Sequence, residues 1–176
     1  MKRPWIAFFS QTGSEIVHVS KLIGRQPDLI VTNSRPSHLR TIHPELEGRV
    51  LFVENKPSER DLIKILTQYR DPIVTLHGWL RIMPPRICNT FEIYNGHPGL
   101  ITLYPELKGK DPQEKAFNLG LPFSGCVIHE VTEGVDEGKI LLQRKVSIKE
   151  LELDSIFTIL HRISVSLWAE FLNNKL

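Results

Sequence analysis

Four short apolar runs in the first half of the chain constrain the fold more than any other feature of the sequence. They lie at residues 6–9, 28–32, 50–53 and 72–76, separated by polar or amphipathic segments. Runs of four or five apolar residues that alternate with helices are typical of a parallel sheet covered on both faces. The sequence therefore predicts an α/β fold with a mostly parallel, twisted sheet and helices on both faces.

Residues with capping preferences mark the expected helix ends. Ser14 is expected to cap the first helix and Gly24 to end it, because apolar residues recur with helical spacing between them. Ser58 with Asp61 three residues later indicates another helix start. Asp154 is expected to cap the last helix, whose apolar stripe comprises Ile156, Leu160, Ile163, Leu167 and Phe171.

The segment after residue 108 predicts a helix followed by a strand pair. Asp111 as N-cap, Pro112 at the first helical position and Glu114 completing a capping box specify the helix start, and Gly120 its stop. Residues 123–131 alternate between two faces, as a strand does. The polar loop 132–138 then returns the chain into a strand at 140–146. We expect antiparallel strands here, attached to the parallel sheet.

Length and composition predict a single domain over residues 1–176, without internal repeats or linkers. A net charge of +2 with scattered basic residues favours neither a nucleic-acid nor a membrane partner. No apolar stretch is long enough for a membrane span, and the apolar residues before Ser10 are too few for a signal peptide. Cys88 and Cys126 lack metal-type spacing and are expected to be buried thiols, so a cytoplasmic location fits.

The most informative segment for function is residues 92–101. It is predicted to be a strand that delivers Asn95 and His97 at its carboxyl end, which is where ligands bind in an open parallel sheet. Side chains at positions i and i+2 of a strand share a face, so both can point into one small volume. An amide donor beside a titratable imidazole is what acyl transfer requires.

Asp136, in a glycine-bearing loop, completes a possible constellation. Asn95 would stabilise an oxyanion, His97 would act as acid and base, and Asp136 would orient His97 and raise its pKa. Each residue also has a plainer interpretation: a turn former, a strand end and a loop residue. His129, on an apolar face, is expected to be a satisfied buried histidine. The remaining histidines have no partner spacing: His18, His38, His43, His77 and His161.

Two further segments allow two interpretations each. The turn 10–14 ends at a helix N-terminus, where backbone N–H groups can hold an anion, but it is equally a simple capped turn. The apolar, non-periodic loop 77–85 is either core packing or the wall of a ligand pocket.

Several motifs together resemble the folate-dependent formyltransferases, in layout most of all those that act on glycinamide ribonucleotide. They are Asn95-Gly-His-Pro-Gly-Leu100, then Tyr104-Pro105, and Gly125-Cys-Val-Ile-His129-Glu-Val-Thr-Glu-Gly-Val-Asp136-Glu-Gly138. The stretch Gly78-Trp-Leu-Arg81-Ile82 resembles the folate-binding loop of the family, and Thr12-Gly13-Ser14 its substrate-phosphate turn. The resemblance extends over residues 5–148.

The resemblance implies a Rossmann-like domain that transfers the formyl group of 10-formyltetrahydrofolate to a primary amine. Glycinamide ribonucleotide or a related nucleotide or sugar amine would be the acceptor, without a metal, in a monomer or homodimer. The matching catalytic positions are Asn95, His97 and Asp136. The matching folate-binding positions are Arg60, Leu80, Arg81, Ile82, Met83, Val131, Thr132, Glu133, Gly134 and Val135. The matching substrate-binding positions are Thr12, Gly13, Ser14 and Pro98.

The chain departs from the family pattern where Glu15 follows Ser14, because the family has a neutral asparagine there. A glutamate at this position would repel a phosphate. Three other functions remain open from the sequence: hydrolysis of 10-formyltetrahydrofolate, binding of folate or nucleotide without turnover, and a metal site built from His97, His129 and Asp136.

Overall fold

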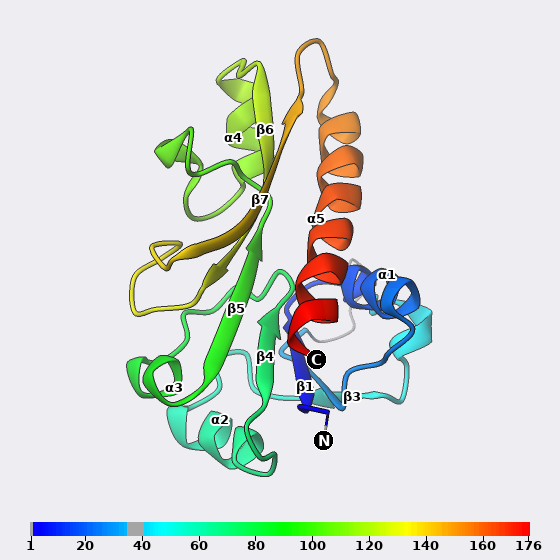
Figure 1. The fold of residues 1–176 in the computed structure, drawn as a ribbon, viewed down its shortest axis with the longest axis vertical. Coiled ribbons are helices and arrows are strands. Elements are labelled where there is room, and N and C mark those ends of the chain that lie inside the picture. The colour runs from blue at the N-terminus through cyan, green and yellow to red at the C-terminus, as the bar shows by residue number, and fades with distance from the viewer. Residues whose placement is uncertain (1, 35–40) are drawn as a thin grey trace.

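The computed structural model describes residues 2–34 and 41–176, which form a seven-stranded sheet flanked by helices (Figure 1). The strand order is β3-β2-β1-β4-β5-β6-β7, with parallel pairing from β3 to β5 and antiparallel pairing of β6 and β7. The strands are β1 (Trp5–Phe9), β2 (Leu29–Thr32), β3 (Val50–Phe52), β4 (Ile73–Leu76), β5 (Glu92–His97), β6 (Phe123–Glu130) and β7 (Ile140–Ser147). The predicted mostly parallel sheet with antiparallel strands towards the C-terminus is confirmed.

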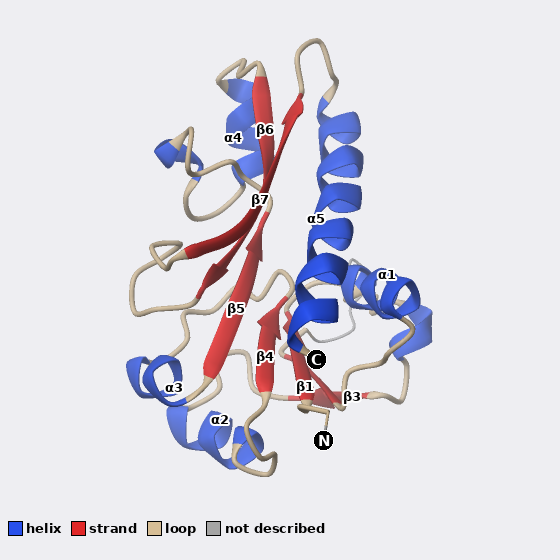
Figure 2. Ribbon diagram, viewed as in Figure 1, coloured by secondary structure: helices blue, strands red, loops and turns tan. Residues whose placement is uncertain are grey.

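Helices cover the two faces of the sheet (Figure 2). Alternating residues of β1 separate two cores: Trp5, Ala7 and Phe9 pack towards α1 and α5, whereas Ile6 and Phe8 pack towards α2 and α3. The helices are α1 (Ser14–Ile23), α2 (Glu59–Leu66), α3 (Pro85–Thr90), α4 (Pro112–Asn118) and α5 (Leu153–Lys175), with short 3₁₀ turns at η1 (Pro44–Leu46) and η2 (Pro105–Leu107). Across the described ranges, α5 included, no helix has the length and apolar character that a membrane span requires.

The start of α1 differs from the prediction. Gly13, not Ser14, occupies the N-cap, with φ of 74°, and Ser14 is the first helical residue. The hydroxyl of Thr12 accepts a hydrogen bond from the Ser14 N–H at 3.3 Å. This bond satisfies one of the free N–H groups at the start of the helix. A Cβ at position 13 would lie 2.5 Å from Leu46 Cδ1, so both backbone conformation and space require glycine here.

The other predicted helix caps have mixed outcomes. Ser58 caps α2 as expected, since its hydroxyl accepts from the Asp61 N–H at 3.1 Å. Gly24 ends α1 in the left-handed conformation as expected. Asp111 occupies the N-cap of α4 but has φ of 55° and makes no side-chain capping bond. The expected cap at Asp154 is wrong, because α5 starts at Leu153, with Glu152 at its N-cap and Asp154 in its first turn.

The C-terminal half of α5 packs against β5, the strand that carries Asn95 and His97. The predicted apolar stripe is buried at Ile156, Leu160, Leu167 and Phe171, and partly buried at Ile163. Trp168, fully buried, packs so closely on β5 that a Cβ at Gly96 would lie 2.5 Å from Trp168 Nε1. The residue between Asn95 and His97 is therefore a glycine because the indole occupies the space of its side chain.

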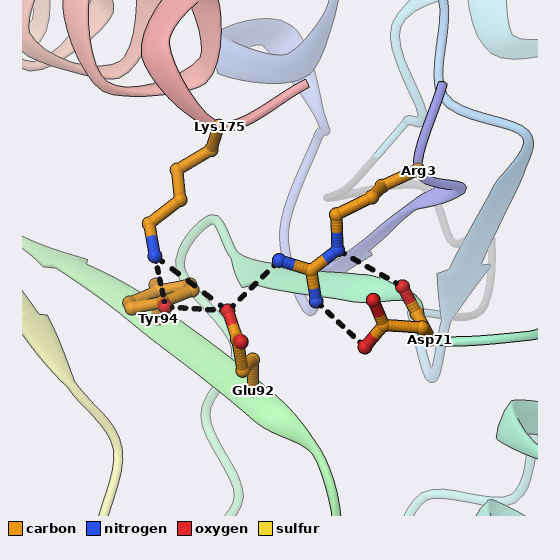
Figure 3. Close-up of polar contacts among 5 residues, drawn as sticks. All are labelled: Arg3, Asp71, Glu92, Tyr94 and Lys175. Carbon is orange, nitrogen blue, oxygen red and sulfur yellow. Dashed lines mark hydrogen bonds and ion pairs between the residues drawn. The ribbon is translucent and has the colours of Figure 1, made fainter. Parts of the chain in front are cut away.

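A polar network joins the ends of three elements at the amino edge of the sheet (Figure 3). Arg3, before β1, pairs with Asp71 at 2.9 Å and with Glu92 of β5 at 3.2 Å. Lys175, at the end of α5, donates to Tyr94 Oη at 2.9 Å and lies 3.6 Å from Glu92. This network fixes the edge of the sheet opposite to the one that carries Asn95 and His97.

Candidate active site

A cavity of about 620 Å³ opens at the carboxyl edge of the sheet. Turns after β1, β4 and β5 line it, together with the loop after β6 and one side of α5. Strand β1 lies between β2 and β4, so chain connections diverge to opposite sides at this point of the sheet. Such a switch point is where open α/β sheets bind ligands.

The three predicted catalytic side chains meet at one wall of this cavity. Asp136 Oδ2 lies 3.4 Å from His97 Nδ1, and Asp136 Oδ1 lies 3.5 Å from Asn95 Nδ2. Asn95 and His97 share a face of β5, and the loop after β6 carries Asp136 over that face. The structure therefore brings together residues that are 41 positions apart in the sequence.

Hydrogen bonds from the backbone hold this arrangement. The Gly109 N–H donates to Asp136 Oδ2 at 2.8 Å, and His97 Nε2–H donates to the Leu107 carbonyl oxygen at 2.7 Å. A carbonyl oxygen only accepts, so the proton of a neutral His97 is on Nε2. Nδ1 is then unprotonated, beside Asp136, and it is the nitrogen that can take up a proton.

The pKa of His97 differs from the prediction. Burial lowers the pKa of this imidazole below its ordinary value, and it outweighs the opposing effects of the Asp136 carboxylate and the Leu107 carbonyl. The side chain is only 7% exposed, which is why desolvation dominates. His97 is therefore neutral in the free protein at neutral pH. Asp136 raises the pKa of His97 as expected, but burial has the larger effect, so the net shift is downward.

Asp136 is ionised in this setting. Burial alone would raise its pKa, but the contacts with His129 and His97 and the hydrogen bond from the Gly109 N–H together hold it below the usual range. Its backbone has φ of 53°, a left-handed conformation that aspartate tolerates better than most residues. The carboxylate is thus a fixed negative charge next to the nitrogen of His97 that can be protonated.

His129 belongs to the same cluster, whereas the sequence analysis grouped it with His97 and Asp136 only in the alternative of a metal site. It faces Asn95 directly across the β5–β6 pair, and its Nε2 lies 3.1 Å from Asn95 Nδ2 and 3.2 Å from Asp136 Oδ1. Its Nδ1–H donates to the Glu130 carbonyl oxygen at 2.7 Å. The expectation that His129 is buried and satisfied is confirmed, but its partners are the site residues. The signal in the sequence that could have shown this is the alternation of residues 123–131, which puts His129 on one face of a strand that pairs with the strand of Asn95.

The positions that resemble the folate-binding segments mostly line the cavity. Residues Leu80, Arg81, Ile82, Met83, Val131, Thr132, Gly134 and Val135 do so. Arg60, exposed on α2, and Glu133 are outside the lining. The loop 77–85 serves both expected purposes, since Trp79 and Met83 are buried in the core and also border the cavity.

The opposite end of the cavity is formed by the turn after β1. Thr12, Gly13 and Ser14 line it, as does Pro98 after β5. The wall continues along one side of α5 with Phe157, Leu160, His161 and Ser164. Glu15 also faces this end, and its side chain is 18% exposed.

The described part of the chain holds no cluster of three or more His, Cys, Asp or Glu side chains arranged to bind a metal ion. Cys126 is buried as expected, whereas Cys88 is only partly buried. Burial raises the pKa of both thiols, so neither is a reactive thiolate.

Comparisons with known proteins agree with this architecture. The family model described as formyl transferase matches residues 9–164. A methionyl-tRNA formyltransferase of Fervidobacterium nodosum is 30% identical over 128 residues, which is 72% of this chain and 40% of that protein. A phosphoribosylglycinamide formyltransferase of Bacillus subtilis is 32% identical over 62% of this chain and 55% of that protein.

The fold is shared with solved structures over nearly its whole length. The phosphoribosylglycinamide formyltransferase of Campylobacter jejuni superposes with a TM-score of 0.80 over 99% of this chain and 97% of that chain, at 17% identity. The chain spans about half, or less, of the two curated relatives named above. Because the family model covers most of the sequence, the chain belongs to the formyl transferase family.

Proposed function

We propose that this protein transfers the formyl group of 10-formyltetrahydrofolate to a primary amine of a small acceptor. The observation that carries the proposal is the convergence of Asn95, His97 and Asp136 on one wall of the cavity. Asn95 can donate a hydrogen bond to an oxyanion, and His97 can act as a base whose protonated form Asp136 stabilises. Family membership agrees with this chemistry.

The reaction starts when the acceptor nitrogen attacks the formyl carbon. Negative charge then develops on the formyl oxygen, and a donated N–H of Asn95 stabilises it, an interaction worth about 2.7–4 kcal/mol in comparable sites. The Asn95 amide nitrogen lies 3.1 Å from His129 Nε2 and 3.5 Å from Asp136 Oδ1, and the N–H that makes the longer of these two contacts is the one that turns to the substrate oxygen.

His97 moves the proton that the attacking nitrogen must lose. Its Nδ1 accepts that proton, and Asp136 at 3.4 Å stabilises the resulting imidazolium. The proton is then delivered to the folate nitrogen as the bond between that nitrogen and the formyl carbon breaks. Atoms and charges balance without a further reactant, and the products are the N-formyl amine and tetrahydrofolate.

Glycinamide ribonucleotide or a related nucleotide or sugar amine is the acceptor class that we propose. The relative from Fervidobacterium nodosum is named for methionyl-tRNA, so this second kind of acceptor should be tested beside the small amines. The net charge of +2 favours a small acceptor over a polyanion. We further propose that the protein acts in the cytoplasm as a monomer or homodimer.

The test is an amine screen with 10-formyltetrahydrofolate as donor, in which tetrahydrofolate release and N-formyl product are measured together. The proposal expects release that depends on the amine and matches product formation. Release that is independent of every amine would instead indicate a hydrolase. Binding of the donor without turnover, unchanged in His97→Ala, would indicate an inert binding module. Activity lost on chelation and restored by zinc would indicate a metal enzyme.

A further inference from the structure

Glu15 is a negatively charged group at the α1 end of the cavity, away from the catalytic trio. It is the second residue of α1 and lines the cavity together with Thr12 and Ser14, and its side chain is hydrogen-bonded to Ser164 of α5. Its carboxylate is bonded to His77 Nδ1 at 2.7 Å. The proposed catalytic steps give this carboxylate no role.

A chain of buried hydrogen bonds fixes the protonation of His77. Trp5 Nε1–H, which can only donate, bonds to Thr75 Oγ1 at 2.8 Å. Thr75 Oγ1 also lies 2.9 Å from His77 Nε2 and has no other side-chain partner among the described residues. The buried hydroxyl proton of Thr75 is therefore satisfied only if it is donated to His77 Nε2.

His77 is then a neutral imidazole that donates from Nδ1 to Glu15. Burial alone would raise the pKa of Glu15, but the hydrogen bonds from His77 Nδ1 and from the Ser164 hydroxyl oppose this effect and help to hold the pKa below the ordinary value. Glu15 is thus ionised, and a neutral His77 leaves its negative charge uncompensated. A partly buried anion of this kind favours a ligand that brings a positive charge or hydrogen-bond donors.

No permanent positive charge among the described lining residues offsets Glu15 at this end. Arg81 lies on the loop after β4, where its guanidinium bonds to Asn55. Lys110 lies on the loop before α4. His161 lowers the pKa of Glu15 electrostatically, but its Nε2 shares a 2.9 Å hydrogen bond with His18 Nδ1, so one of these two rings accepts and is neutral.

We propose that Glu15 selects amine acceptors that carry no phosphate at the α1 end and present ammonium or hydroxyl donors there. The inference rests on the proposed formyl transfer and narrows its acceptor class. Within the proposed acceptor class, the inference favours phosphate-free amines over glycinamide ribonucleotide, because a phosphate placed at this end would lie near the Glu15 carboxylate.

The experiment uses acceptor pairs that differ only in a phosphate: glycinamide ribonucleotide with its nucleoside, and glucosamine 6-phosphate with glucosamine. Wild-type kcat/KM should favour the phosphate-free member of a pair about tenfold or more, given the size of a like-charge contact near a protein surface. Glu15→Gln keeps an acceptor for His77 and removes the charge, so it should reduce this preference at least about tenfold. Glu47→Gln, exposed and outside the cavity, is the matched control.

Binding measurements can test this inference independently of the proposed formyl transfer. Calorimetry with the same pairs and with inorganic phosphate needs no turnover: phosphate should bind Glu15→Gln more tightly than wild type. Comparing 1,2-diaminoethane with ethanolamine shows whether ammonium or hydroxyl donors are preferred. Wild-type preference for the phosphorylated members, or an unchanged ratio in Glu15→Gln, would overturn the inference. Transfer that fails with every amine, together with the expected binding order, would refute only the transfer proposal.

Discussion

At the scale of single residues, Asn95 offers the cleanest separation of chemistry from stability. Asn95→Ala removes the proposed oxyanion donor, and kcat should fall about 10²–10³-fold while the substrate KM changes little. Steady-state kinetics with an amine identified by the screen measures the effect. Asn118→Ala, on the exposed side of α4, should leave kcat unchanged. A fall in KM and kcat together, or a fall below tenfold, would assign Asn95 another role.

The pH dependence of the reaction tests the pair of His97 and Asp136. The proposed base is neutral His97, so kcat/KM should rise with pH through a pKa below the ordinary histidine value of about 6.5. Asp136 opposes the lowering, so Asp136→Asn should move this limb to still lower pH and reduce the plateau about 10²-fold.

The matched control for this profile is Asp154→Asn, which alters an exposed carboxylate in the first turn of α5. Its profile should overlay that of the wild type. A limb that moves to higher pH in Asp136→Asn would show that the carboxylate does not stabilise the His97 imidazolium.

The sequence predicted part of this residue-level arrangement, for a simple geometric reason. Asn95 and His97 are two positions apart on a strand, and their shared face follows from strand periodicity. That Asp136 reaches His97, and that His129 joins them, depends on the loop after β6 and on the β5–β6 register, which the local sequence does not encode. The effect of Asp136 on the pKa of His97 was predicted in the right direction, but the larger, opposite effect of burial depends on residues from several segments and could not be predicted.

At the scale of elements, the contact of α5 with β5 determines how accurately the site residues are placed. Gly96→Ala would put a methyl group 2.5 Å from Trp168 Nε1, so either the strand or the helix must move. We expect a loss of about 1–3 kcal/mol in the free energy of unfolding. We also expect lower kcat, because both neighbours of Gly96 are proposed catalytic residues. Urea denaturation and kinetics on the same samples measure the two effects.

A double-mutant cycle identifies the cause of that loss. Trp168 Nε1 is buried and has no hydrogen-bond partner among the residues that the structure describes, so Trp168→Phe removes the crowded atoms without breaking a described hydrogen bond. Gly96→Ala should therefore cost less in the Trp168→Phe background than in the wild type. Equal costs in both backgrounds would mean that the indole is not the obstacle.

The elements themselves were predictable to different degrees. Strands β1 to β5 followed from short apolar runs, and the antiparallel pair from alternation and a polar return loop. Helix α3 has only six residues, of which Pro85 is the first, so it has too few turns to show helical spacing. The predicted Ser14 cap was displaced by one position because Leu46 and Phe9 leave room only for glycine at position 13.

At the scale of the whole molecule, the buried site makes folding sensitive to acid. The pKa of folded His97 is lowered, so the unfolded chain binds more protons below about pH 6.5 and stability falls as pH decreases from there. The contribution of His97 is at most about 1.4 kcal/mol per pH unit. His18, whose pKa is lowered in the same direction, is exposed and adds less.

The carboxylates of Asp136 and Glu15 contribute a second, more acidic phase. Their folded pKa values are depressed, so the stability they provide is complete above the unfolded values near 4 and is lost as pH falls through the folded ones. Urea unfolding at intervals from pH 7 to pH 3 should therefore show two separate declines in the free energy of unfolding.

Replacing His97 by Asn should flatten the decline between pH 6.5 and 5 and leave the more acidic one, whereas Asn118→Ala should preserve both. If the free energy of unfolding of the His97 variant kept the same slope against pH above pH 5, protonation of His97 would not be the cause of that decline.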